Sequence, residues 1–389
     1  INLTQYVRKN AFPVVWSRFS EKAWSLESPA VESLMQKIKS VGIPLKDFAG
    51  VKPYRGLLTG FNEAFLIDDE TRKTLIYDSQ KCVELIKPYL RGADVKRWNP
   101  EWANLWIILI KSSANCEWAW SKAKTEVEAE AIFAQTCPLM YKHLKSHEEK
   151  LRNRQDQGRF WWELRACKYY NSFEMPKIIY QVIQTSPQYA LDVTGMYGND
   201  KTFILPNSDL YLLGCLNSPI AWWYGNRVFT RMLSDSVSPM GFIFESLPIA
   251  QPTPTIRTET EEIVTRLIAI TKENQQRNRE VCEWIQSTHN IPKLGQKLED
   301  FSSLTQAEFV QAIRDRKPKT SGDLSPKAFK AINEAYQEYA IPVQRDRAEA
   351  NRLEHRLNDL INQAYQLTPE EIELMWRTAP PRMPISRDL

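Results

Sequence analysis

Hydrophobic and polar positions follow three different patterns along the chain. Near the start, Val31, Leu34, Met35 and Ile38 fall at helical spacing, which predicts an amphipathic helix over residues 28–40. Ser28 and Pro29, which precede these positions, suit the N-cap and the first helical position. We expect residues 1–43 to form a connector from a segment upstream.

Residues 44–250 have a mixed pattern that predicts both strands and helices. Strands are expected in short apolar runs at 64–67, 106–110, 177–183, 189–193 and 202–205. Helices are expected at about 121–133, 138–153, 210–216 and 219–228. Three prolines within 247–255 indicate a linker after this region.

Residues 251–389 have a helical pattern. Two sets of positions alternate at spacings of four and three, which is typical of a narrow apolar seam between paired helices. They are Ile263, Leu267, Ile270, Asn274, Arg277, Val281 and Trp284, and Leu353, Leu357, Leu360, Ala364 and Leu367. The pattern fits either an extended antiparallel pair or a compact bundle. Helix starts are expected at capping boxes formed by Thr258 with Glu261, Thr305 with Glu308 and Thr368 with Glu371.

The composition is that of a globular protein, with 43% hydrophobic and 25% charged residues. No apolar run reaches the roughly 18 residues of a membrane span, and the net charge is only +4. Six cysteines are spread singly, which predicts reduced thiols, a cytoplasmic location and no structural zinc. His143 and His147 are four residues apart but have no third ligand, so no metal site is expected.

Catalytic chemistry is missing from the sequence. Adenine methyltransferases hold the flipped base with an Asn/Asp-Pro-Pro-Tyr/Phe loop, and the sole Pro-Pro pair, Pro380-Pro381, lacks the amide and the aromatic. No glycine-rich nucleotide loop is present among the 13 glycines. Asp68 and Asp69 with Lys73 are an incomplete set for a metal-dependent nuclease. We therefore assign no catalytic residue and no metal ligand.

Three segments carry chemistry suited to nucleic acid. The loop Gly56–Asn62 has two glycines around Thr59, which would let backbone N–H groups approach a phosphate or simply form a turn between strands. Residues 86–98 interleave cations and aromatics around a glycine. Residues 152–170 hold five cations and five aromatics, so they either contact DNA or form a tryptophan core with arginines at its surface. The candidate DNA contacts are Arg55, Thr59, Asn62, Arg91, Lys96, Arg97, Arg152, Arg154, Arg159, Trp161, Arg165, Lys168, Tyr169 and Lys177.

Five motifs in order resemble the TaqI-like C-terminal specificity domain of type IIG restriction–modification enzymes and of related phage-exclusion methyltransferases. They are a Gly-x-x-Thr-Gly-x-Asn-x-Ala-Phe loop (56–65), a Pro-aromatic-Leu-x-Gly-x-Asp-Val-x-Arg segment (88–97), a Pro-Lys-Ile-Ile-Tyr strand (176–180), a Leu-Leu-x-x-Leu-Asn-Ser-Pro turn (212–219) and a Tyr-x-Leu-Thr-x-Glu-Glu-Ile close within 364–372. Leu58 departs from the lysine or threonine that often precedes the Thr-Gly pair, which removes one potential phosphate contact.

The resemblance implies an α+β protein in three parts: the connector 1–43, a mixed α/β target-recognition domain at 44–250 and an all-helical spacer domain at 251–389 with a long helix pair. It implies sequence-specific recognition of double-stranded DNA as the C-terminal part of an adenine-N6 methyltransferase of a restriction–modification or phage-defence system. The methyl donor S-adenosylmethionine is expected in an upstream catalytic domain and no cofactor in this segment. Expected partners are double-stranded DNA, that domain and defence-system subunits, with no membrane.

Two competing hypotheses remain. The chain could be a protein–protein scaffold that docks a partner along Leu353, Leu357 and Leu360 without reading DNA. It could also be a nuclease that uses Asp68 or Asp69 with Mg²⁺.

Overall fold

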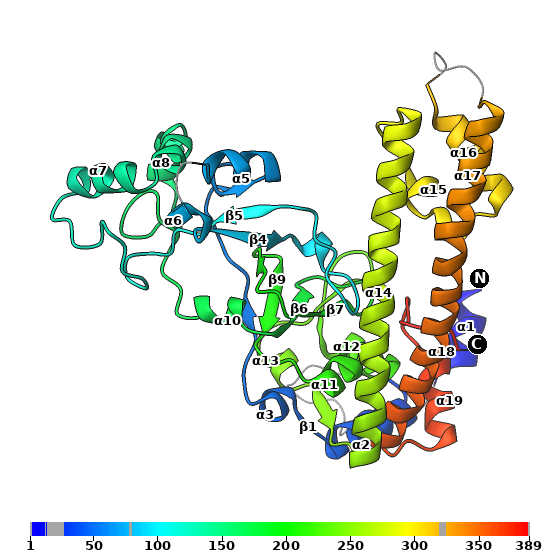
Figure 1. Ribbon diagram of the computed structural model, residues 1–389. Coiled ribbons are helices and arrows are strands. Elements are labelled where there is room, and N and C mark those ends of the chain that lie inside the picture. The colour runs from blue at the N-terminus through cyan, green and yellow to red at the C-terminus, as the bar shows by residue number, and fades with distance from the viewer. Residues whose placement is uncertain (1, 12, 14–26, 78–79, 319–323, 388–389) are drawn as a thin grey trace.

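The fold is taken from a computed structural model, which describes all residues except 1, 12, 14–26, 78–79, 319–323 and 388–389. A mixed α/β lobe and a tower of long helices stand side by side and meet at the base of the molecule (Figure 1). This is the predicted α+β class.

Two four-stranded sheets form the framework of the α/β lobe. In the order β2-β9-β6-β7 all neighbours are antiparallel, and in the order β3-β5-β4-β8 the pair β4 and β8 is parallel. The bounds of the first sheet are Tyr54–Arg55, Thr202–Leu205, Lys177–Gln181 and Tyr189–Asp192. Those of the second are Leu66–Ile67, Trp106–Ile108, Ile86–Leu90 and Tyr197–Gly198. Ile178 and Ile179 of β6 are both fully buried, which shows that this strand is covered on both faces.

The helices of the lobe are short and close over the sheets. They are α3 (Leu45–Ala49), α4 (Asn62–Phe65), α5 (Asp69–Leu75), α6 (Gln80–Val83), α7 (Glu126–Thr136), α8 (Pro138–Lys145), α9 (Glu148–Asn153), α10 (Tyr170–Glu174), α11 (Leu210–Leu216), α12 (Pro219–Val228) and α13 (Gly241–Glu245). Asp209 and Ser218 cap α11 and α12 as their sequence context indicates. The expected strand at 64–67 is wrong in its first half, because Ala64 and Phe65 complete the one-turn helix α4.

The helical tower is built on an extended pair. Helix α14 (Pro254–His289) runs up the tower and α18 (Ile341–Ala364) runs down it, antiparallel (Figure 1). Seam residues Ile263, Leu267, Leu357 and Leu360 are buried between them and α11, so the seam predicted from spacing is real and extended. The remaining elements are α1 (Leu3–Asn10), α2 (Pro29–Val41), α15 (Gln296–Glu299), α16 (Gln306–Arg316), α17 (Pro326–Ala335), the π-helical turn Tyr336–Ala340 and α19 (Pro369–Arg377).

One hydrophobic core joins the beginning, the middle and the end of the chain. Helix α2 contributes Val31 and Leu34 to the same cluster as Leu212 of α11 and Leu360 of α18. Strand β1 (Gly42–Pro44) pairs antiparallel with β12 (Pro248–Ala250). The expected linker at 247–255 is therefore wrong in part, since it includes a buried strand and the first turn of α14. The division at 43 and 250 stays a prediction.

Two other local predictions need correction. Thr258 does not cap a helix, because α14 begins earlier, at Pro254, with Thr253 as its N-cap; the capping boxes at Thr305 and Thr368 are confirmed. The cysteines are not all reduced: Cys82 of α6 and Cys137 at the start of α8 form a disulfide, since packing of the two helices brings their Cα atoms within 6.1 Å. No helix among the described residues is long and apolar enough to cross a membrane.

Candidate nucleic-acid interface

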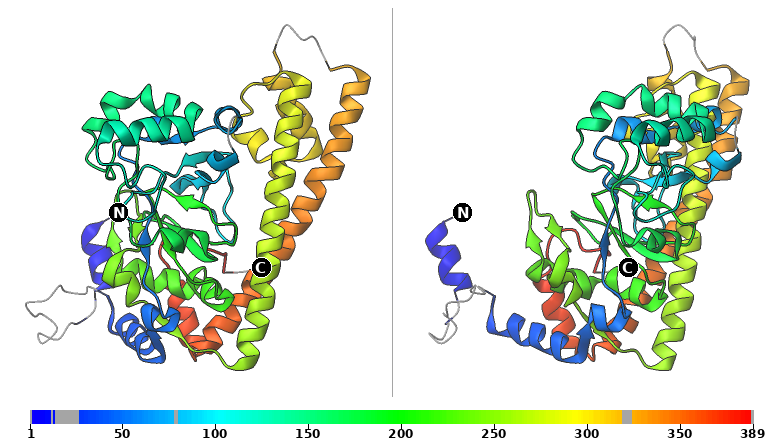
Figure 2. Two further views of the ribbon diagram at one scale, coloured as in Figure 1. Left: turned by 60° about the vertical axis from the view of Figure 1, so that its left-hand side comes forward. Right: turned by 90° about the vertical axis from the view of Figure 1, so that its left-hand side faces the viewer.

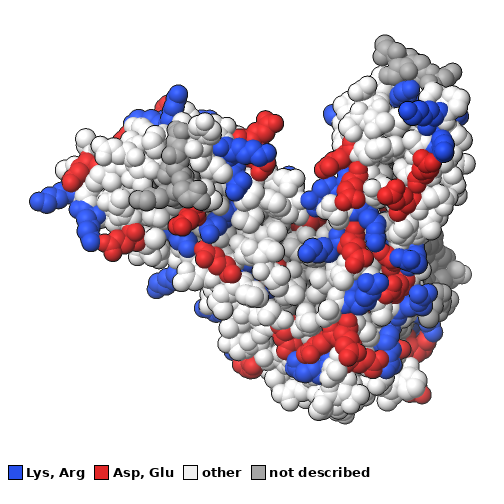
Figure 3. Space-filling model, in the orientation of Figure 1, with Lys and Arg blue, Asp and Glu red and all other residues white. Residues whose placement is uncertain are grey.

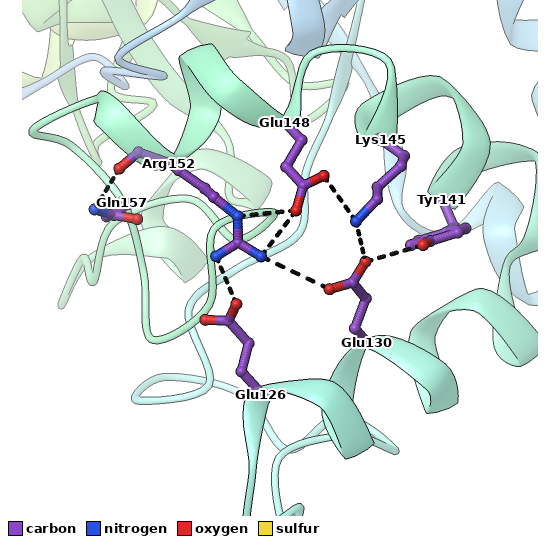
Figure 4. A network of polar contacts seen from close by, with 7 residues as sticks. All are labelled: Glu126, Glu130, Tyr141, Lys145, Glu148, Arg152 and Gln157. Carbon is purple, nitrogen blue, oxygen red and sulfur yellow. Dashed lines mark hydrogen bonds and ion pairs between the residues drawn. The ribbon is translucent and has the colours of Figure 1, made fainter.

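The predicted contact Arg152 lies in an acidic network. It pairs with Glu126, Glu130 and Glu148, and Lys145 pairs with Glu130 and Glu148, so that the network joins α7, α8 and α9 (Figure 4). Three carboxylates surround two cations. Arg152 therefore holds three helices together and is not free for a phosphate, contrary to the sequence-based prediction.

Arg154 and Trp161 are also structural. Arg154 is 6% exposed, stacks over Phe65 and donates to the backbone carbonyls of Thr59, Trp161 and Glu163. Burial lowers the pKa of this guanidinium to about 10. The Trp161 side chain is buried in the core of the lobe. Neither residue can reach DNA. The alternative interpretation of residues 152–170, a tryptophan core with arginines at its surface, is confirmed for Trp161, whereas Arg154 is buried with the core.

Lys177 and Thr59 have structural roles, whereas the candidate Asn62 is exposed and accepts a hydrogen bond from Thr59. Lys177 is fully buried and forms an ion pair with Asp192. Desolvation lowers the pKa of Lys177, and Asp192 opposes that shift. Thr59 is buried and donates its hydroxyl proton to the Asn62 side chain, so it shapes the loop from within.

Arg97 and Arg159 bind other parts of the chain. Arg97 pairs with Glu354 of α18 at 2.6 Å and donates to the carbonyl of Asn217, which fixes the lobe against the tower. Arg159 is exposed, but its guanidinium donates to the Ser121 and Ala123 carbonyls. The prediction took Arg97 and Arg159 as cations free to contact DNA, and the structure corrects it, because both bind other parts of the chain.

The remaining candidates gather where three loops meet. The loop that starts at Gly56 touches the turn at Asn199: a Cβ on Gly56 would lie 1.8 Å from the Asn199 carbonyl oxygen, so no other residue fits there. The Asn199 N–H in turn donates to the carbonyl of Leu90, directly before the turn Gly92–Asp94. The motif that begins at Gly56 and the motif at 88–97 are thereby joined through the turn at Asn199.

Cations at these loops are only partly neutralised. Arg55 and Lys201 both lie against Asp200, at 3.6 Å and 3.0 Å between charged atoms. Arg91 pairs with the buried Asp94, while Lys96 is exposed and has no ion-pair partner among the described residues.

Aromatic groups continue this surface. Tyr169 stacks on Tyr54 with ring centroids 4.5 Å apart, next to the exposed Lys168. Arg165 pairs with Asp156 at 3.0 Å. Burial raises the pKa of Tyr169, and the nearby charges of Arg165 and Arg55 partly oppose that rise. We call this surface the loop surface. It comprises the two tyrosines and the cations Arg55, Arg91, Lys96, Arg165, Lys168 and Lys201. Arg55 and Arg165 lie near Tyr169, and Gly92, next to Arg91, packs against Lys201. Lys96 and Lys168 are exposed residues of the same loop segments.

The loop surface is a local feature of a chain with mixed charge. Its six cations stand against three carboxylates, Asp94, Asp156 and Asp200. By contrast, on the face drawn in Figure 3 basic and acidic side chains are interleaved over both the α/β lobe and the tower. Binding of a polyanion depends on such a local excess.

Lys201 was missed by the sequence-based prediction. The available signal was the turn after Gly198, where Asn199, Asp200 and Lys201 precede a strand. Lysines are common in surface turns. Lys201 belongs to the loop surface because Gly56 packs against this turn.

The nuclease hypothesis finds no support in the described part of the chain. Asp68 caps α5 by accepting the Thr71 N–H, which lowers the pKa of Asp68. Asp69 forms an ion pair with Lys73. No group of three or more metal-ligating side chains occurs among the described residues.

Comparison with known proteins identifies part of the chain. Residues 87–249 match the family described as the TaqI-like C-terminal specificity domain, which confirms the resemblance over that range. Residues 253–361 match a family described as a domain of unknown function, DUF8810.

Two individual proteins are similar to the chain. Type II methyltransferase M.MjaIV of Methanocaldococcus jannaschii is 26% identical over 185 residues, which are 45% of this chain and 56% of that protein. The chain thus spans little more than half the length of this relative. The type IIL restriction-modification enzyme MmeI, solved in complex with DNA, superposes with a TM-score of 0.44 and 11% identity over 84% of this chain and 35% of that chain.

Proposed function

We propose that the chain recognises a sequence in double-stranded DNA as the specificity part of an adenine-N6 methyltransferase in a restriction–modification or phage-defence system. The observation that carries the proposal is the family match over residues 87–249, which includes Arg91, Lys96, Arg165, Lys168 and Lys201 of the loop surface. A relationship to restriction–modification methyltransferases supports it.

The loop surface supports a contact with duplex DNA. Lysine and arginine side chains position a protein on the phosphate backbone, and base readout comes from side chains carried on the same loops. Three loops at the ends of strands, locked together by Gly56, Asn199 and Leu90, provide a rigid base for such contacts. We assign no residue to a base.

The chemistry of methyl transfer belongs, in this proposal, to a separate catalytic domain that binds S-adenosylmethionine. The residues of this chain do not fit that cofactor, because the sequence has no glycine-rich strand-to-helix turn and no Asn/Asp-Pro-Pro-Tyr/Phe loop. No catalytic step is therefore assigned to this chain. Its partners would be DNA, the catalytic domain and other defence-system subunits in the cytoplasm.

Charge reversal at three lysines tests the proposal. Lys96, Lys168 and Lys201 are exposed, so the triple variant K96E/K168E/K201E leaves the core intact. Binding to a mixed-sequence duplex is measured by fluorescence anisotropy across a series of KCl concentrations. Each lost phosphate contact removes about 0.9 from the slope of log K against log salt, so the slope should fall by roughly 3.

A matched control carries the same change in net charge elsewhere. K46E/K142E/K327E reverses three exposed lysines of α3, α8 and α17, and should keep the wild-type salt slope. If both triple variants lose affinity equally, the binding is a general charge effect and the loop surface is not the interface. If the wild-type chain fails to bind duplex DNA at low salt, the proposed function is wrong.

The scaffold hypothesis is not favoured by the packing. Leu357 and Leu360 are each 2% exposed, and Leu353 packs against the same core. The surface that a partner was expected to cover is already covered by α14 and α12 of the chain itself.

A further inference from the structure

A hairpin stands out from the α/β lobe beside the loop surface. Strands β10 (Thr230–Arg231) and β11 (Val237–Ser238) pair antiparallel and continue from the end of α12. In the right-hand view of Figure 2 the two yellow-green strands project from the body.

The tip of this hairpin is a tight turn of strained, non-glycine residues. Ser234 and Asp235 have φ values of 57° and 58°, the left-handed conformation that both central residues of a type I′ turn require. Serine and aspartate adopt it less readily than glycine. The turn is held by the N–H and hydroxyl of Ser236, which both donate to the Leu233 carbonyl.

This tip presents an apolar side chain to solvent. Leu233 is 88% exposed and the preceding Met232 is 43% exposed. Single exposed leucines are ordinary on protein surfaces. Here the leucine directly precedes the central turn residues Ser234 and Asp235, both of which are exposed. Arg231, next to Met232, is exposed and has no ion-pair partner among the described residues.

The base of the hairpin is bonded to the segment that adjoins the loop surface. The Ser238 hydroxyl donates to the Val182 carbonyl at 2.7 Å, and the Val182 N–H donates to the Lys201 carbonyl at 2.9 Å. The backbones of Gln184 and Val237 exchange two hydrogen bonds of 2.9 Å. Arg231, which pairs with Val237, is therefore connected to Lys201 through residues 182–184.

We propose that the hairpin inserts Leu233 between base pairs of the duplex that the loop surface holds, with Arg231 on an adjacent phosphate. Minor-groove binding proteins use leucine, methionine and similar side chains as wedges that unstack a base step. Arg231 lies before the apolar pair Met232 and Leu233, and the carboxylate Asp235 lies beyond it in the turn. The exposed apolar pair suits the stacked interior of a duplex, and Arg231 suits its phosphates. The inference rests on the proposed function and adds an active deformation of the DNA.

Unwinding of a plasmid measures this deformation without knowledge of the recognition sequence. Closed-circular DNA is relaxed by topoisomerase I in the presence of the full chain and then freed of protein. An inserted wedge unwinds the duplex and leaves a shifted topoisomer distribution on a gel. We expect the shift with the wild-type chain and its loss with L233S.

The affinity for duplex DNA is measured on the same variants. L233S should bind duplex DNA within about threefold of wild type, because the cost of unstacking offsets most of the gain from insertion. V127S is the matched control, since Val127 of α7 is 80% exposed and lies outside the hairpin and the loop surface. R231E should lower the salt slope by roughly 1.

The outcomes separate the two proposals. A wild-type chain that binds DNA but leaves the topoisomers unchanged refutes the wedge and leaves the proposed function standing. A shift that persists in L233S refutes it equally. Self-association of the wild-type chain in analytical ultracentrifugation that disappears in L233S would make the hairpin a contact between copies and overturn the wedge. Failure of the wild-type chain to bind any duplex overturns the proposed function itself.

Discussion

Replacement of Arg154 by methionine should destabilise the protein without weakening DNA binding by the folded molecules. The guanidinium of Arg154 is buried and supplies the donors for the carbonyls of Thr59, Trp161 and Glu163. Methionine retains an unbranched apolar chain over Phe65 but has no donor. Three buried carbonyls then lose the hydrogen bonds that connect the Gly56–Asn62 loop to residues 161–163.

The magnitude follows from two opposing contributions. Hydrogen bonds to a charged group contribute about 1.5–3 kcal/mol each, so three of them contribute roughly 4.5–9 kcal/mol. Burial of the guanidinium, which lowers its pKa to about 10, offsets roughly 3 kcal/mol of this. We expect R154M to lower the free energy of unfolding by about 4 kcal/mol.

The assay is urea unfolding followed by tryptophan fluorescence, since Trp161 and Trp162 lie in the affected core. R152M is the comparison, because the Arg152 side chain is 40% exposed and a surface pair contributes about 0–1 kcal/mol. DNA affinity is measured at a temperature where the variant is folded. A loss of affinity in R154M with unchanged stability would refute the structural role and restore Arg154 as a DNA contact.

Three further predictions concern the rest of the fold. A double-mutant cycle with R97M and E354Q should give a coupling of about 1–3 kcal/mol in thermal or urea unfolding, and additive effects would mean that the pair does not join lobe and tower. Desolvation lowers the pKa of His143 below its usual 6.5, so as the pH falls the unfolded chain takes up this proton before the folded chain does. The free energy of unfolding should therefore fall as the pH drops from 7 towards 5, and H143N should make this pH dependence weaker. Removal of the Cys82–Cys137 bond by C82S should lower stability by about 3–4 kcal/mol, because the bond closes a loop of 55 residues, and reductant should then have no additional effect.

Local signals in the sequence predicted the starts of the longer helices, whereas the helix expected over 138–153 is two helices, α8 and α9, and the one expected from residue 121 begins at Glu126. The capping residues Ser28, Ser218, Thr305 and Thr368 each precede a helix. Such caps can be predicted from the sequence because the side-chain oxygen accepts a hydrogen bond from an N–H only three residues further along. The seam of α14 and α18 was found for a similar reason, since its spacing reports helix geometry directly. Thr258 failed because Thr253 provides an equivalent cap one turn earlier.

The cations of the proposed interface were harder to predict, because charge within a sequence window says nothing about partners outside it. Arg152 looked free beside Arg154 and Arg159, yet Glu126 and Glu130 reach it from α7. The loop surface depends on a close approach of Gly56 to Asn199, which no local pattern indicates. Distances between loops are a property of sheet order, and β2 lies beside β9 only in the folded chain.

The pairing of β1 with β12 has a consequence for the engineering of altered specificity. Because α2, β12 and both tower helices contribute to one core, and β1 pairs with β12, a chimaera spliced at residue 250 would join two incomplete halves from different parents. The loops carrying Arg55, Arg91 and Lys201 lie outside that core. Transplanting those loops as a set, on an unaltered scaffold, is the exchange that this architecture tolerates.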